Sequence, residues 1–220
     1  MFYHLNSSTP STSPSFILTC HGLGKRFNRE WIFRRLDFTF QSGNVYAITG
    51  PNGSGKSTLL QILWGQSPPT TGTLSYQKDN TVIPVEDVYN HISIATPYMD
   101  LIDEFTLQEQ LEFHFKMKSM RNQISIDELI EQMFLTDARD KFIGNFSSGM
   151  RQRVKLGLAF YTEADVIFLD EPGTNLDKQN FEWYLTQLQN RDKSVIVIIA
   201  SNNPEEYIES TDQLNITQFK

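Results

Sequence analysis

The chain has 220 residues, of which 39% are hydrophobic and 20% are charged, and its formal net charge is −7. This length and composition suit one globular domain with a sizeable core. The acidic balance argues against a general nucleic-acid binder, because such proteins usually present a basic surface, so we expect no nucleic acid among the partners.

Two further features bear on location. Cys20 is the only cysteine, so no internal disulfide can form, and a cytoplasmic location is the default expectation. The longest apolar run, residues 195–200, is far too short to span a bilayer. Any association with a membrane is therefore expected to run through another chain.

The N-terminal residues predict a leader without regular structure. Residues 6–15 read NSSTPSTSPS, a polar stretch with two prolines and no periodicity. The N-terminus also lacks the basic and apolar segments of a signal peptide. We predict a disordered polar leader over residues 1–15 and a single folded domain over residues 16–220.

The first part of that domain contains four candidate strands. Residues 16–20 form the first, and residues 32–40, which end in an alternating apolar pattern, contain the second. Residues 45–49 (VYAIT) are a short apolar run typical of a buried strand. A further strand is expected at residues 73–76, after a loop that contains two prolines and a glycine.

A phosphate-binding loop follows the buried strand at residues 45–49. Residues 50–58 match the pattern G-x-x-x-x-G-K-[ST] at every fixed position, and residues 58–64 read as a helix. Its glycines allow a tight turn that aims backbone N–H groups at a phosphate. The nine predicted nucleotide-binding residues are Gly50, Pro51, Asn52, Gly53, Ser54, Gly55, Lys56, Ser57 and Thr58. In this pattern Lys56 reaches the β- and γ-phosphates, and the Ser57 hydroxyl binds Mg²⁺.

The middle of the chain reads as helical. Thr106 and Glu109 have the spacing of a capping box and predict a helix that runs to about Met120. Ser125 and Glu128 have the same capping-box spacing and precede an amphipathic stretch over residues 126–134. The Met and Phe side chains of these helices fit either a contact surface or, as we prefer, a small helical core.

The last part of the chain predicts a βαβ unit. A helix is expected over residues 148–162, and another over residues 180–190. The apolar runs at residues 166–169 and 195–200 do not alternate, which is typical of parallel strands covered on both faces. A phosphate loop at the carboxyl ends of such strands is the expected ligand position.

Two carboxylates follow the strand at residues 166–169. Asp170 suits the coordination shell of Mg²⁺, and Glu171 can take a proton from an attacking water as a general base. An acidic pair that ends a strand is common on surfaces and is a weak signal alone. It becomes a strong signal because a phosphate loop precedes it by some 114 residues.

In these residues the chain resembles the ATP-binding domain of ABC transporters. Residues 50–58 resemble the Walker A motif of that family, residues 167–171 its Walker B motif with the catalytic glutamate, and residues 172–177 its D-loop. Residues 146–153 (FSSGMRQR) resemble its signature segment in degenerate form. The resemblance implies an α/β fold: a P-loop NTPase core with a mostly parallel sheet, an antiparallel β subdomain and a small helical subdomain at about residues 98–150.

The resemblance also assigns residues outside the phosphate loop. Ser147 and Gly149 open a helix whose free N–H groups form an anion site, although an ordinary Ser N-cap is the alternative. In the family this site meets ATP held by a second subunit in a head-to-tail dimer. Phe27 lies where the family places an aromatic side chain that stacks on adenine, and Trp31 is a nearby competitor.

Two positions depart from the family. Where a glutamine is usual, residues 95–98 read ATPY, so Pro97, or Thr96 after a shift of one, takes its place. Where a histidine is usual, the chain has Asn202, whose amide can donate to the γ-phosphate but cannot carry a positive charge. We therefore hypothesise slower hydrolysis than in a typical member.

The resemblance implies an ATPase that binds ATP and Mg²⁺ and drives transport through a separate integral membrane permease. The subunit would be cytoplasmic, peripheral to the membrane, and paired with itself or a related subunit, and residues 101–143 would carry the docking surface. A soluble ABC-type ATPase in assembly is the first alternative. A slow ATP-binding switch with weak hydrolysis is the second.

Overall fold

The computed structural model describes residues 15–220, so the predicted leader, apart from Ser15, lies outside the described residues. The strands are β1 (Phe16–Phe27), β2 (Glu30–Gln41), β3 (Val45–Thr49), β4 (Thr71–Lys78), β5 (Thr81–Ile83), β6 (Ile92–Ala95), β7 (Val166–Asp170), β8 (Ile196–Ala200) and β9 (Asp212–Asn215). The α-helices are α1 (Lys56–Leu63), α2 (Leu107–Met117), α3 (Ile126–Gln132), α4 (Ser148–Tyr161) and α5 (Lys178–Gln189). Short 3₁₀ turns connect several of them.

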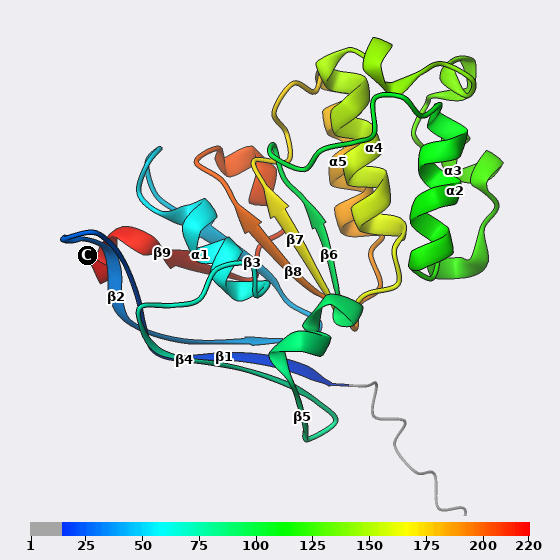
Figure 1. Cartoon of the computed structure of the whole chain (residues 1–220). Coiled ribbons are helices and arrows are strands. Elements are labelled where there is room, and N and C mark those ends of the chain that lie inside the picture. The colour runs from blue at the N-terminus through cyan, green and yellow to red at the C-terminus, as the bar shows by residue number, and fades with distance from the viewer. Residues whose placement is uncertain (1–14) are drawn as a thin grey trace, which may run out of the picture.

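The strands form two sheets. Four strands pair antiparallel in the order β2-β1-β4-β5, and five pair in parallel in the order β6-β7-β8-β3-β9. The connection from β7 through α5 to β8 is the predicted βαβ unit, and its two strands are neighbours in the parallel sheet. The antiparallel sheet lies along one side of the molecule, at the bottom of Figure 1.

The parallel sheet separates two hydrophobic cores. Because successive side chains of a strand point to opposite faces, Tyr46 and Ile48 lie in one core and Val45 and Ala47 in the other. The first core also contains buried side chains of the antiparallel sheet and of α1, so α1 is packed between the two sheets (Figure 1). The second core is completed by the other helices. This layering confirms the predicted α/β fold class.

Helices α2 to α5 lie on the far side of the parallel sheet, with α2 and α3 outermost (Figure 1). Both predicted capping boxes are present: Thr106 caps α2 together with Glu109, and Ser125 caps α3 together with Glu128. The prediction was wrong at the end of α3, because the backbone turns to a positive φ of 54° at Phe134 and leaves that ring 54% exposed.

Element boundaries differ from the predictions mainly in length. β1 and β2 continue well beyond the predicted strands because they pair with each other along most of their length. β5, β6 and β9 were not predicted, since each has only three or four residues. Among the described residues, no helix combines the length and hydrophobicity that crossing a membrane requires.

Candidate nucleotide site

A cavity of about 620 Å³ lies at the carboxyl ends of the parallel strands. Its walls come from the phosphate loop, from the ends of β7 and β8, from the segment after β6 and from β2. The lining residues are Ile32, Asn52, Gly53, Gly55, Lys56, Ser57, Thr58, Pro97, Tyr98, Asp170, Glu171, Thr174 and Asn202. Most of the predicted site residues are therefore brought together, as expected at this edge of a parallel sheet.

The phosphate loop has the conformation that its glycines predict. Gly50, Gly53 and Gly55 have φ values of 145°, 73° and 108°, which favour glycine over other residues. At Gly55 a side chain would also collide with Ile32 of the antiparallel sheet. The loop leads directly into α1, whose first turn carries no acidic side chain. No acidic side chain of the helix itself therefore offsets its positive end, which suits an anionic ligand.

Lys56 is the cation of the loop and is only 5% exposed. Its Nζ donates to the carbonyl oxygens of Gly50 at 3.1 Å and Pro51 at 3.5 Å. It also lies 3.5 Å from Oε1 of Glu171. These contacts hold the ammonium at the mouth of the loop, where it can neutralise phosphate charge.

Asp170 and Ser57 form a pair of oxygen ligands suited to Mg²⁺. Asp170 is 2% exposed, and its Oδ1 has no hydrogen-bond partner among the described residues. The pKa of Asp170 is raised overall, because the effect of burial exceeds that of a hydrogen bond with Ser57, which lowers the pKa. Mg²⁺ is commonly bound by one or two protein oxygens together with phosphate oxygens, so these residues fit that ion. Residues 15–220 contain no cluster of three or more His, Cys, Asp or Glu that could hold a metal alone.

Glu171 has a left-handed backbone, with φ of 46°, which is uncommon for a residue other than glycine. Its N–H donates to the carbonyl oxygen of Ala200 at 2.8 Å, which fixes it at the edge of β8. Its carboxylate lies between Lys56 and the Ser201 hydroxyl, whose Oγ is 3.4 Å from Oε2. Such backbone strain often marks functional positions, and here it orients a carboxylate toward the cavity.

Asn202 lies at the cavity opposite the phosphate loop. Its Nδ2 donates to Oδ1 of Asn52 at 3.0 Å, so its amide is directed at the loop. Pro97 lines the cavity, whereas Thr96 is buried. The carbonyl oxygens of Pro97 and Thr96 accept hydrogen bonds from Nζ of Lys155, at 2.8 and 3.2 Å. Helix α4 therefore fixes the segment where a glutamine was expected.

The two aromatic side chains considered for adenine stacking lie outside the cavity. Phe27 ends β1 with its ring 52% exposed, 5.2 Å from Nζ of Lys25, and does not line the cavity. Trp31 does not line it either; it lies under the Arg26 guanidinium. Adenine stacking on Phe27 stays a prediction.

Three lining residues were not predicted: Ile32, Tyr98 and Thr174. Nothing local distinguishes Ile32 from the other apolar residues of its strand, because only the packing of the antiparallel sheet against the loop brings it to the cavity. Tyr98 and Thr174 each follow closely on a strand end of the parallel sheet, which is the signal that could have found them.

The signature-like segment starts α4, also outside the cavity. Ser147 is the N-cap, and its Oγ accepts from the Met150 N–H at 3.2 Å. A Cβ on Gly149 would lie 2.9 Å from the carbonyl oxygen of Asn175, so the helix start packs closely on the segment after Glu171. Ser147 is exposed. Within the described residues, the anion site at Ser147 is open to solvent. That it forms half of a nucleotide site stays a prediction.

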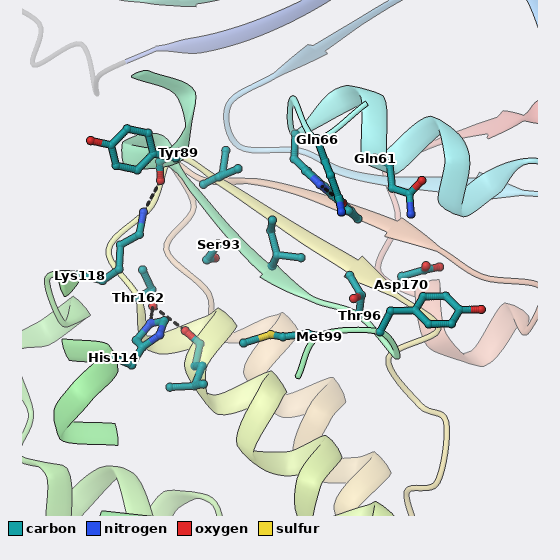
Figure 2. Close-up of a pocket in the computed structure, with 15 residues that line it drawn as sticks. Gln61, Gln66, Tyr89, Ser93, Thr96, Met99, His114, Lys118, Thr162 and Asp170 are labelled. Atoms are coloured by element: carbon teal, nitrogen blue, oxygen red, sulfur yellow. Dashed lines mark hydrogen bonds between the residues drawn. The ribbon is translucent and has the colours of Figure 1, made fainter. Parts of the chain in front are cut away.

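A second cavity of about 410 Å³ adjoins the first, and Tyr98 and Asp170 line both. Figure 2 shows Thr96 and Asp170 together at one end and His114, Lys118 and Tyr89 at the other. Apolar side chains, such as those of Trp64, Ile92, Ile94, Met99 and Leu158, also line this cavity. Burial and the nearby Lys118 lower the pKa of His114 to about 4, so this ring stays neutral at physiological pH.

Known proteins resemble the chain across most of its length. It is 31% identical to the Nod factor export ATP-binding protein I of Burkholderia lata, over 79% of this chain and 59% of that protein. It is 30% identical to the sulfate/thiosulfate import ATP-binding protein CysA of Thermosynechococcus vestitus, over 90% of this chain and 60% of that protein. The chain thus spans about 60% of the length of these curated relatives.

Solved structures show the same fold. A dimeric ATP-binding cassette in a post-hydrolysis state, bound to ADP and Pi, superposes with a TM-score of 0.75 at 21% identity, covering 90% of this chain and 94% of that one. The family model described as ABC transporter matches residues 33–174, which include the phosphate loop, the signature-like segment and the acidic pair. The chain therefore belongs to the ABC transporter family, as an ATP-binding domain.

Proposed function

We propose that the chain binds and hydrolyses Mg-ATP to drive transport through a separate membrane subunit. The observation that carries the proposal is the meeting of Lys56, Ser57, Asp170 and Glu171 in one cavity at the end of the parallel sheet. A cation, two magnesium ligands and a general base are the parts that phosphoryl transfer to water requires.

In this proposal each residue has one role. The loop N–H groups and Lys56 hold the β- and γ-phosphates. Ser57 and Asp170 hold Mg²⁺, which when bound neutralises charge on the phosphate oxygens. Glu171 accepts a proton from a water molecule while the oxygen of that water attacks the γ-phosphorus. The bond between the γ-phosphorus and the bridging oxygen breaks, and that oxygen leaves as part of ADP. Asn202 donates a hydrogen bond to the γ-phosphate, without a charge.

We also propose that two copies, or this chain and a relative, sandwich the nucleotide head to tail. The support is that Ser147 and the N-terminus of α4 present an exposed anion site that the chain's own cavity does not use. The dimeric ADP-bound cassette of the same fold is consistent with this arrangement. Gln152 donates from α4 to the carbonyl oxygen of Pro172 at 2.8 Å, so the signature helix is connected to the segment after the base.

A helix from an integral membrane permease is the partner that we propose for the second cavity. Apolar walls with polar groups at both ends suit an amphipathic helix laid into a groove. Tyr98 and Asp170 separate this groove from the nucleotide cavity, so a helix seated there would respond to changes around the phosphates. The docking surface predicted at residues 101–143 contributes His114 and Lys118 to it. The subunit would then be cytoplasmic and peripheral to the membrane.

The proposal is tested by measuring phosphate release by the purified chain at millimolar Mg-ATP, and by copurification with membranes that contain a candidate permease. Steady turnover together with recovery in the membrane fraction supports a transport subunit. Turnover without any membrane partner would favour a soluble assembly ATPase. The uncharged Asn202 favours the remaining candidate, an ATP-binding switch. That reading predicts retained nucleotide with hydrolysis near background.

A further inference from the structure

A buried carboxyl group lies behind the proposed base and does not line the cavity. Glu206 belongs to the short 3₁₀ turn Pro204–Tyr207 that follows β8, and it is only 4% exposed. Burying a carboxyl without a cationic partner costs free energy, so a buried glutamate calls for an explanation. Its neighbour Glu205 in the same turn is exposed.

Glu206 is fixed by contacts with residues after β8, after β7 and in α5. The Ser201 side chain and the N–H of Gly173 lie close enough to its carboxyl to lower its pKa by hydrogen bonding. A Cβ on Gly173 would lie 2.6 Å from Oε1, so this close approach requires glycine two residues after Glu171. The Tyr184 hydroxyl donates to the backbone carbonyl of Glu206 at 2.5 Å. Oε2 of Glu206 has no hydrogen-bond partner among the described residues.

Ser201 stands between the two carboxyl groups. Its hydroxyl is fully buried, lies 3.4 Å from Oε2 of Glu171 and also contacts Glu206. The N–H of Asn203 donates to the same Oγ at 2.9 Å. A hydroxyl has one proton to donate and two lone pairs to accept with. Ser201 can therefore donate to Glu171 or to Glu206, but not to both.

The protonation state of Glu206 decides whether the Ser201 hydroxyl donates its hydrogen bond to Glu171 or to Glu206. When Glu206 is protonated, it donates to Ser201, and Ser201 is free to donate to Glu171. When Glu206 is ionised, it competes for the Ser201 proton. Burial raises the pKa of Glu206 to about 7, against the hydrogen bonds of Ser201 and Gly173, which lower it, and with the charges of Glu171 and Asp170, which raise it. The protonated form is therefore accessible near neutral pH.

We propose that Glu206, in its neutral form, is a positioning residue that acts through Ser201 to orient the carboxylate of Glu171 toward the attacking water. This inference rests on the proposed role of Glu171 as general base. The chain of contacts Glu206, Ser201, Glu171 also connects the segment after β8, which contains Asn202, to Glu171, which follows β7 at the cavity.

The test compares Glu206→Gln and Glu206→Ala with the exposed control Glu205→Ala in steady-state ATPase assays from pH 6 to 9. Glu206→Ala is expected to lower kcat about tenfold while KM for ATP changes less than about twofold, because only the base is misplaced. Glu206→Gln keeps a neutral donor and is expected to retain at least about half of the wild-type kcat at pH 7. The control should match wild type.

The pH profile separates positioning from a structural role. Wild-type kcat should fall as pH rises through about 7, where Glu206 ionises, and this fall should be absent in Glu206→Gln. A Glu206→Ala variant with wild-type kcat would overturn the proposal, as would a Glu206→Gln profile that follows the wild type. If Glu206→Ala fails to fold, judged by its thermal unfolding, the Glu206→Gln profile alone decides.

A parallel assay of Glu171→Gln distinguishes this inference from the proposed function. If Glu171→Gln turns over ATP as fast as wild type, the assignment of the base fails and the inference fails with it. If Glu171→Gln is inactive but Glu206→Ala is fully active, only the positioning role of Glu206 is rejected.

Discussion

Two helices of this chain begin with residues that favour an anion, and their surroundings differ. The start of α1 is enclosed: Lys56 is buried, contacts the loop carbonyls and pairs with Glu171, which follows β7. The start of α4 is open: Ser147 is exposed and its hydroxyl serves only to cap its own helix, through Met150. Among residues 15–220, a base and magnesium ligands surround the first site, and no such group surrounds the second.

This contrast suggests different roles in nucleotide binding and hydrolysis for the two helix starts. The enclosed site contains the groups for binding and chemistry, so it should hold nucleotide in a single copy. Among the described residues, the open site offers N–H groups and hydroxyls but no base and no metal ligand, so we infer that it contributes to a nucleotide held by another copy. Changes at the two sites should therefore separate binding from turnover.

The largest effect is expected from the enclosed site. Glu171→Gln removes the proton acceptor without changing the size of the side chain, so hydrolysis should fall about 10²–10⁴-fold. ATP affinity should remain close to that of wild type, because Lys56 and the loop are unchanged. Phosphate release and equilibrium binding of labelled ATP check this, with Glu205→Gln as the exposed control. Substantial residual hydrolysis would remove Glu171 as the base.

A somewhat smaller effect is expected from the open site. Ser147→Arg places a bulky cation where a second copy should dock, so turnover should fall on the order of 100-fold while a single copy still binds ATP. Gln132→Arg, which adds the same charge at an exposed position, should behave like wild type. Wild-type turnover in Ser147→Arg would contradict the shared site.

Mixing two inactive variants sharpens the comparison. In a head-to-tail dimer of Ser147→Arg with Lys56→Ala, one of the two sites combines an intact loop with an intact Ser147 segment. If the copies pair at random, about a quarter of all sites become complete, and up to about a quarter of wild-type activity should return. Failure of the mixture to regain any activity would mean that the two regions do not act across copies.

The smallest expected effect concerns the γ-phosphate contact. Asn202→His supplies a group that can carry positive charge, and charge-assisted hydrogen bonds are roughly twice as strong as neutral ones. Hydrolysis should rise about three- to tenfold, most clearly below pH 7, where more of the histidine is protonated. Steady-state assays of both proteins decide the matter. An unchanged or lower rate in Asn202→His would count against the hypothesis of slow turnover.

Local signals predicted much of the fold. The run at residues 45–49 gave the bounds of β3, because five consecutive apolar or β-prone residues between turn residues leave few alternatives. The capping boxes at Thr106 and Ser125 located the starts of α2 and α3, since both halves of that motif lie within four residues. Site residues that belong to a motif with fixed spacing along the chain, such as Lys56 and Asp170, were predicted, and they line the cavity.

What sequence reasoning missed depends on contacts between distant segments. Glu206 lies in an ordinary polar turn, and its burial depends on contacts with distant segments, such as those of Gly173 and Tyr184. Ile32 reaches the nucleotide cavity because the antiparallel sheet packs against the loop, which no local pattern indicates. β9 has a single buried residue, Leu214, and forms a strand only because β3 pairs with it.

The most direct test of the account is the oligomeric state of Glu171→Gln, measured by light scattering with millimolar Mg-ATP. If α4 of a second chain closes the site, the molecular mass should double only with ATP and Mg²⁺, not with ADP, and the doubling should be lost when Ser147→Arg is added. A protein that stays monomeric while saturated with Mg-ATP, or a dimer that ignores Ser147→Arg, would contradict the claim that a second chain's α4 closes the site.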